Sequence, residues 1–400
     1  MEHYKKIKKT LSFLISGTAV NGFNIIVGLM LTAALYRNHS VEVIGQYLFL
    51  SAVGMLLSQV ISFGNYELVL AKKEEIIRIF GSNMFYLQSY FIFYLCSSIC
   101  LVILGVHIFK TLSYFDGLLV FLILVQRYLN TFAKNLDWYW VSEFIVKILI
   151  PFGMMVFIVT EAFKDIIVAA SIIQFLACLV LILPVIQNFQ FTKVMPISCV
   201  KYTFKNFQYV SMSIVDNLNN LLPTIIFGIF NMNTNITIWN ICMQLYRAMT
   251  VQNEIVNNYF RFKGKGNLLP QRDLFKMVIQ NFWLIIPISA SALFLVFALD
   301  ELVFDYLKIS NFFDRSDLQI MYAEIFLFSC LQSFIIFDIY SSSRTYVMVL
   351  LLLRLLSLIA VMATGLFLEM YVVHIFIVYL IIRIMFTGLS AFRSFVYHAA

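Results

Sequence analysis

Residues 11–35 read LSFLISGTAVNGFNIIVGLMLTAAL, an apolar run that carries two asparagines and follows the basic segment KKIKK at residues 5–9. A helix of about 20 apolar residues crosses a hydrocarbon core of roughly 30 Å, so the run predicts a membrane-spanning helix. It is longer than the apolar part of a secretory signal, and we expect it to be retained as the first span.

Similar runs recur along the whole chain. The sequence is 62% hydrophobic and only 12% charged, whereas about 25% of the residues of a soluble domain are charged. We therefore predict an all-α polytopic membrane protein with about 12 transmembrane helices. The spans are expected at residues 11–35, 44–63, 83–105, 116–133, 138–160, 166–187, 207–230, 235–260, 274–299, 318–340, 345–366 and 371–390.

The positive charges follow this topology. Lysine and arginine concentrate in the N-terminal segment and in the loops on the same side, whereas the opposite loops hold few of them. The positive-inside rule then places both termini in the cytoplasm. The net charge of +7 is explained by this asymmetry, and we expect no nucleic-acid partner.

The first span has a counterpart in the second half of the chain. Sliding residue 211 onto residue 16 aligns SGTAVNGFNIIVG (16–28) with SMSIVDNLNNLLP (211–223), and it sets Asn21 opposite Asp216. The offset keeps the orientation, which predicts a parallel pseudo-repeat about an axis along the membrane normal. The two six-helix lobes are expected at residues 1–190 and 191–400.

Polar side chains interrupt several spans. An ionised side chain at mid-bilayer costs about 2.5–3.5 kcal/mol, so such groups normally face a bundle interior or a water-filled cavity. Guanidinium groups bind phosphate oxygens in a bidentate manner and stay charged, so deep arginines suit an anionic substrate. The polar and charged residues concerned are Asn21, Asn24, Lys147, Asp216, Asn220, Arg247, Arg354, Arg383, Glu143 and Glu254.

Internal pairing is the alternative for these groups. Glu143 and Lys147 are four residues apart on one span and could neutralise each other. Arg247 could pair with Glu254, seven residues later on nearly the same face of its helix. Asparagines inside spans also form hydrogen bonds from helix to helix. Both interpretations remain open on the sequence alone.

Signatures of soluble enzymes are missing from the sequence. The segment RFKGKGN (261–267) does not fit the GxxxxGK[ST] pattern of an ATP-binding loop, and the five histidines are dispersed. The six cysteines lie mostly in apolar runs and read as small buried hydrophobes. We expect no cofactor and no metal, and transport would draw on an ion gradient, the membrane potential or the substrate gradient.

This pattern resembles the multidrug/oligosaccharidyl-lipid/polysaccharide exporter superfamily, and within it the chain looks most like the O-antigen flippases. The likeness rests on the twelve spans in two parallel halves, the polar first span of each half and the buried arginines. It also rests on the basic amino end before FLISGTAVNGFNIIVGLMLTAAL (13–35), on VIGQYLF (43–49) and on FGNYELVLAK (63–72).

The resemblance implies a protein that is not an enzyme. It would flip an undecaprenyl-pyrophosphate-linked oligosaccharide from the cytoplasmic to the periplasmic leaflet of the bacterial inner membrane by alternating access. The pyrophosphate would be attracted by Arg247, Arg354, Arg383 and Lys147, with Asn21, Asn24 and Asn220 lining the cavity. Protons or sodium ions would be exchanged by Asp216, Glu143 or Glu254. Membrane lipid, a polymerase and a chain-length regulator would be the partners.

Two other functions remain alternatives at this point. A cation-coupled drug exporter of the same superfamily would prefer acidic cavity residues. An O-antigen polymerase or a polyprenol-dependent glycosyltransferase would place catalytic residues in a large outer loop, for which DELVFDYLKISNFFDRSD (300–317) is the candidate.

Overall fold

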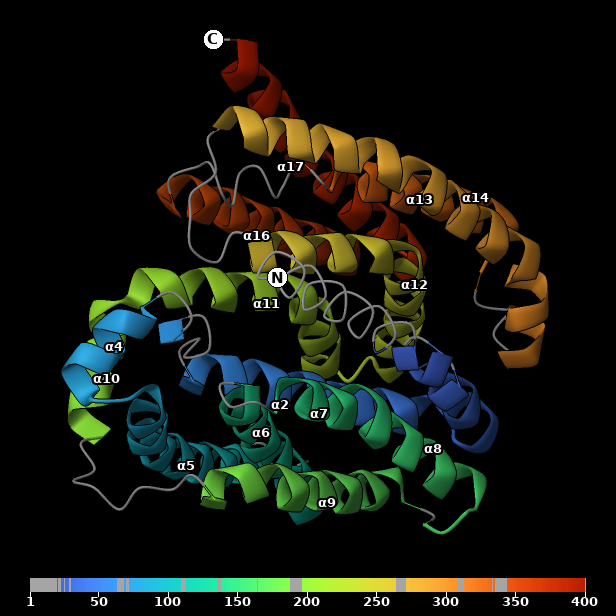
Figure 1. The fold of residues 1–400 in the computed structure, drawn as a ribbon. Helices are drawn as coiled ribbons and strands as arrows, with labels where there is room; N and C mark the ends of the chain where they lie inside the picture. Colours follow the sequence, from blue (N-terminus) through green and yellow to red (C-terminus); the bar gives the residue numbers. More distant parts are fainter. Residues whose placement is uncertain are drawn as a thin grey trace, which may run out of the picture. The chain divides into compact units, whose positions relative to one another are not determined.

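In the structure, a computed structural model, the regular elements of the described residues are helices (Figure 1). The described residues are 20, 23–24, 26–28, 30–62, 68–69, 72–108, 113–134, 138–163, 165–187, 196–263, 271–307, 313–332, 334 and 344–399. Within these ranges there is no β-strand. The all-α class predicted from the sequence is therefore confirmed.

Eight of the described helices are long and apolar enough to cross a membrane. They cover the segments Val41–Ser62, Asn83–Gly105, Tyr114–Lys134, Val141–Val159, Ile166–Gln187, Val278–Ala298, Met348–Phe367 and Val372–Val396. Three more of the predicted spans are helices with more polar or shorter sequences: α11 (Phe207–Ile229), α12 (Asn233–Lys263) and α14 (Arg315–Leu331). Most of the first predicted span lies outside the described residues. The chain is a multi-pass membrane protein.

By their internal contacts the residues group into two compact units. One unit is residues 38–236, and the other is residues 1–37 together with 237–400. The first contains α2 (Val41–Ser62), α4 (Lys73–Phe80), α5 (Asn83–Ile108), α6 (Tyr114–Lys134), α7 (Tyr139–Phe144), the π-helix η1 (Ile145–Leu149), α8 (Ile150–Val159), α9 (Ile166–Gln187), α10 (Pro196–Lys205) and α11. The second contains α12 from residue 237 onward, α13 (Gln271–Leu307), α14, α16 (Arg344–Phe367) and α17 (Val372–Ala399). The lobe boundary at residue 190 stays a prediction.

The predicted repeat has a counterpart in the contacts inside each unit. In the first unit α11 packs against α2. In the second, Tyr36 at the end of the first span donates a hydrogen bond from its hydroxyl to the Thr237 carbonyl of α12, at 3.2 Å. The repeat makes α11 the equivalent of the first span and α12 the equivalent of α2. Thus α11 packs against α2 of the other half, and the described end of the first span contacts α12.

Close approach of α2 to its neighbours depends on two glycines. A Cβ atom at Gly45 would lie 2.7 Å from the Cα of Asn233, and a Cβ at Gly228 would lie 2.6 Å from Cγ of Phe49. Contacts this short leave no room for a side chain. Small residues allow such packing in membranes, where lipid and protein are equally apolar and van der Waals contact stabilises the helix pair.

The centre of the first unit is α6, which packs against α2, α5 and α9. The ring of Tyr128 on α6 contacts two tyrosine rings of α5. Its centroid lies 4.4 Å from that of Tyr94 and 6.4 Å from that of Tyr90. The hydroxyls of Tyr90, Tyr94 and Tyr128 donate to the carbonyls of Ile61, Leu124 and Leu87, at 2.8, 2.9 and 2.9 Å. Each buried hydroxyl is thereby satisfied inside the bundle, where water is absent.

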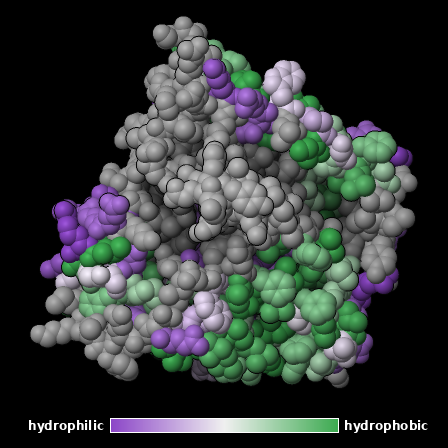
Figure 2. Space-filling view, viewed as in Figure 1, coloured by the Kyte–Doolittle hydropathy of each residue, from purple (hydrophilic) through white to green (hydrophobic). Residues whose placement is uncertain are grey.

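The exterior of this unit is apolar where lipid is expected. Figure 2 shows hydrophobic side chains over the surface on which α8 and α9 lie. The exposed apolar residues of these two helices include Phe152, Val159, Phe175 and Leu183. A helix that is hydrophobic on all sides is typical of a membrane span.

Candidate functional site

A π-helical turn interrupts the fifth predicted span. The segment α7–η1–α8 runs continuously, and the amide of Ile150 donates to the Ile145 carbonyl five residues back. Pro151 explains the change of pitch, because proline has no N–H and its ring clashes with the carbonyl four residues earlier, which belongs to Lys147. Single π-turns occur frequently at functional sites.

Three charged side chains gather beside this turn. The Glu143 carboxylate contacts the Lys134 Nζ through Oε1, and its Oε2 lies 3.0 Å from the Lys147 Nζ. We call Lys134, Glu143 and Lys147 the lysine–glutamate cluster. Lys134 stands in the last turn of α6, where a positive charge also complements the helix dipole.

The cluster carries a net charge of +1, because one carboxylate faces two ammonium groups. The Glu143 side chain is only 8% exposed, whereas the side chains of Lys134 and Lys147 are 20 and 26% exposed. The carboxylate is thus enclosed and the two lysines reach the surface. Two membrane-spanning segments meet here, since one ends at Lys134 and the next begins at Val141.

The pairing of Glu143 with Lys147, one of the two alternatives that the sequence left open, is present as an ion pair. Their roles in substrate binding and ion coupling remain predictions. Lys134 was missed, because it comes from the preceding helix and no spacing rule connects it to Glu143. One signal could have suggested the contact between Lys134 and Glu143: the lysine ends one apolar run, and the glutamate comes shortly after the start of the next.

Arg383 lies in a cage of three aromatic rings. Its guanidinium carbon is 4.9 Å from the ring centre of Phe328, 5.0 Å from that of Tyr246 and 5.3 Å from that of Tyr379. Its Nη1 also donates to the Tyr379 hydroxyl at 2.7 Å. The three rings come from α12, α14 and α17, so the arginine connects three helices. Cation–π contacts of a desolvated arginine contribute up to about 2 kcal/mol each.

The other predicted residues are not brought to one place by any contact described. Arg354 is buried on α16, Arg247 is exposed on α12, and Asn24 and Asn220 are half-buried. The side chains of Asp216 and Glu254, as well as all of Asn21, lie outside the described residues. Their roles remain predictions. Asn219, the repeat partner of Asn24, is fully buried.

A histidine–carboxylate contact joins α14 to α17. The Nε2 of His374 lies 3.3 Å from the Asp317 carboxylate, and the His374 ring contacts Tyr371 edge-on. Burial raises the pKa of Tyr371, and the neighbouring acidic residues add to this shift. Among the residues that the structure describes, no group of three histidines, cysteines or carboxylates could hold a metal ion.

No family model matches the chain, and no curated protein matches it. Two solved structures are similar to it over almost its full length. One is described as the outward-facing conformation of a multidrug resistance MATE family transporter of the MOP superfamily; it is 12% identical, with a TM-score of 0.49, over 97% of this chain and 94% of that chain. The other is a crystal structure of MATE in complex with MaL6, 10% identical, with a TM-score of 0.46, over 97% of each chain.

Proposed function

We propose that this membrane protein is a flippase. Its substrate would be an oligosaccharide linked through pyrophosphate to a polyprenol, and it would move the head group from the cytoplasmic to the outer leaflet of a bacterial inner membrane. The observation that carries the proposal is the lysine–glutamate cluster, an enclosed carboxylate between two surface-reaching lysines at the ends of two membrane-spanning segments.

The cluster suits a pyrophosphate head group for electrostatic reasons. Hydrogen bonds between an ammonium and a phosphate oxygen are charge-assisted and about twice as strong as neutral ones. Glu143 holds both Nζ atoms close together when no substrate is bound, so the two donors are ordered in advance. The net charge of +1 attracts the pyrophosphate to the cluster. The pyrophosphate can then replace the carboxylate as the partner of Lys134 and Lys147.

The position of the cluster fits a substrate that arrives in the membrane. The distribution of lysine and arginine predicts that this end of the two spans, together with both termini, faces the cytoplasm. A head group at the inner leaflet reaches the two lysines while its polyprenyl tail stays among the lipids. Two arginines lie deeper in the predicted spans. Arg247 is exposed and suits a contact with the head group at a later stage of transport, whereas Arg383 is enclosed by its three rings.

Glu143 is then the candidate for coupling to an ion. When the pyrophosphate takes over the lysines, the carboxylate loses both of its cationic partners inside a membrane-spanning segment. An isolated ionised carboxylate is costly there, so it gains from binding a proton or a sodium ion. The delivered repeat units would be consumed by a polymerase with its chain-length regulator.

Transport can be measured with the purified full chain in liposomes. The liposomes contain a trace of undecaprenyl-pyrophosphate-linked oligosaccharide with a fluorescent label on the glycan, and an impermeant quencher reports how fast the protected fraction becomes accessible. We expect wild type to accelerate this exchange. Lys134→Gln and Lys147→Gln should each slow it about tenfold, the effect of losing one charge-assisted contact of roughly 1.5 kcal/mol. Lys276→Gln, at an exposed site on α13, serves as the matched control.

Two results would contradict the proposal. If the wild-type protein does not accelerate the exchange, flipping of this substrate class is excluded. If wild type and both lysine variants give equal rates, the lysine–glutamate cluster is excluded as the binding site of the pyrophosphate. A polymerase would be recognised in a strain that lacks the gene. There, single repeat units would reach the outer leaflet and fail to polymerise, whereas loss of a flippase traps them on the cytoplasmic face.

A further inference from the structure

The short helix α10 has one face fixed against the protein. Cys199, Tyr202 and Thr203 are buried on this face. The hydroxyls of Thr203 and Tyr86 form a hydrogen bond of 2.5 Å. The Tyr202 ring contacts Tyr86 edge-on at 6.0 Å. Because Tyr86 stands in the first turn of a membrane-spanning helix, α10 lies level with the end of that span.

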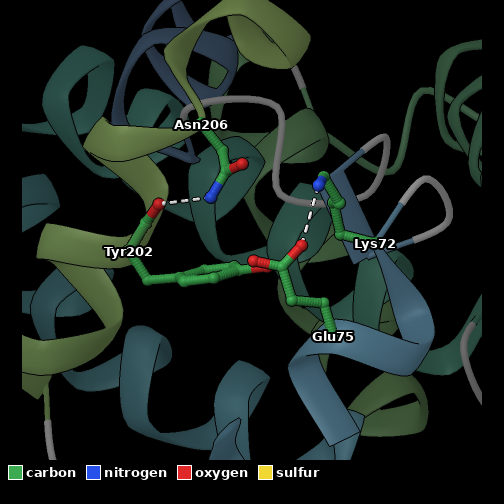
Figure 3. Close-up of polar contacts among 4 residues, drawn as sticks. All are labelled: Lys72, Glu75, Tyr202 and Asn206. Atoms are coloured by element: carbon green, nitrogen blue, oxygen red, sulfur yellow. Dashed lines mark hydrogen bonds and ion pairs between the residues drawn. The ribbon is translucent and has the colours of Figure 1, made fainter. Parts of the chain in front are cut away.

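The position of α10 is fixed a second time by α4. Figure 3 shows the Tyr202 hydroxyl beside the Glu75 carboxylate, which is paired with the Lys72 Nζ at 2.7 Å. The Asn206 side chain donates to the Tyr202 carbonyl at 2.9 Å and closes the end of the helix. These contacts hold α10 along the end of the bundle, at the depth where lipid headgroups lie.

The opposite face of α10 is apolar and basic. Ile197 is 72% exposed and Phe204 is 52% exposed, and a separation of seven residues places them on the same side of the helix, two turns apart. Lys201 and Lys205 are exposed next to them. Cys199, Tyr202 and Thr203 are buried on the opposite side of the helix. The contacts of α10 with α4 and α5 therefore do not explain why Ile197 and Phe204 point outward.

We propose that α10 is an interfacial helix that binds anionic phospholipid headgroups. Ile197 and Phe204 enter the boundary between headgroups and acyl chains, and Lys201 and Lys205 contact the phosphates, an arrangement in which the lysine stems also cover apolar surface. A soluble anion would be attracted by the lysines but would gain nothing from the two large apolar side chains. The alternation of apolar and basic residues on one face, at headgroup depth, therefore favours lipid. The proposal does not depend on the transported substrate.

The first test measures lipid binding to the full chain in detergent micelles by native mass spectrometry. Phosphatidylglycerol, phosphatidylcholine and inorganic phosphate are titrated separately. We expect tighter binding of phosphatidylglycerol than of phosphatidylcholine, and a loss of about 30-fold in Lys201→Gln/Lys205→Gln, since each lysine near an anionic surface contributes about fivefold. Lys201→Gln and Lys276→Gln form the matched single-substitution pair, in which only the former should weaken binding.

The second test reports insertion directly. Phe204→Trp in the full chain is reconstituted into vesicles of phosphatidylglycerol and phosphatidylcholine brominated near the headgroup end of the acyl chains. We expect bromine quenching in excess of that of the four native tryptophans, and less of it when phosphatidylglycerol is omitted. Absence of excess quenching would overturn the proposal. So would phosphatidylglycerol binding that is unchanged by the double lysine substitution, or displacement of the lipid by inorganic phosphate.

Discussion

Replacing Glu143 by glutamine should destabilise the protein more than replacing either of its lysine partners. The substitution leaves Lys134 and Lys147 facing each other without the carboxylate that they share. Two unit charges about 5 Å apart repel by about 3 kcal/mol at an effective dielectric constant near 20. Because both lysines are partly exposed, they can turn toward water, and we expect a loss of about 2 kcal/mol in the free energy of unfolding.

The order of the variants is the sharper part of this prediction. Lys147→Gln leaves one neutral ion pair and should cost less than about 1 kcal/mol. The double variant Glu143→Gln/Lys147→Gln removes the repulsion again and should be more stable than Glu143→Gln alone. Such a recovery is the sign of direct coupling between neighbours.

The assay is unfolding of the purified full chain in detergent micelles, by heat and by increasing SDS. Glu42→Gln is the matched control, because Glu42 is exposed in the first turn of α2 and its loss should change little. The reasoning is refuted if Lys147→Gln costs as much as Glu143→Gln, or if the effects of the two substitutions simply add in the double variant.

Three further results are expected from the same unfolding assay. Arg383→Lys keeps the charge but loses the guanidinium that lies close to three ring centres, and should lower stability by about 1–2 kcal/mol; a variant as stable as wild type would contradict the role of the cage. Burial lowers the pKa of His39 against the opposite effect of Asp165, so the folded chain takes up a proton less readily than the unfolded chain. Stability should fall as the pH drops below about 6.5, and His39→Gln should reduce this dependence. Gly45→Ala should cost about 1–3 kcal/mol through overpacking against Asn233 at the start of α12, whereas Gly105→Ala, with open space around it, should not destabilise.

The parts of the site that lie on one helix could be predicted from the sequence. Glu143 and Lys147 are four residues apart, and this spacing fixes their proximity once the helix forms. The tyrosines of α5 also recur every four residues, so a shared face was visible, but the carbonyls that accept their hydrogen bonds belong to other helices. The spacing within a helix is a local property, whereas the choice of a partner helix is not.

The all-α membrane class follows from the residues alone, because the length and apolarity of each run decide whether a helix can cross the hydrocarbon core. Matched polar positions also indicate the internal repeat. The contact of Lys134 with Glu143 and the enclosure of Arg383 by three helices depend instead on how the helices pack. The physical reason is that lipid and neighbouring helices are equally apolar. Hydrophobicity therefore cannot tell which face of a span meets protein, and packing and hydrogen bonding select it.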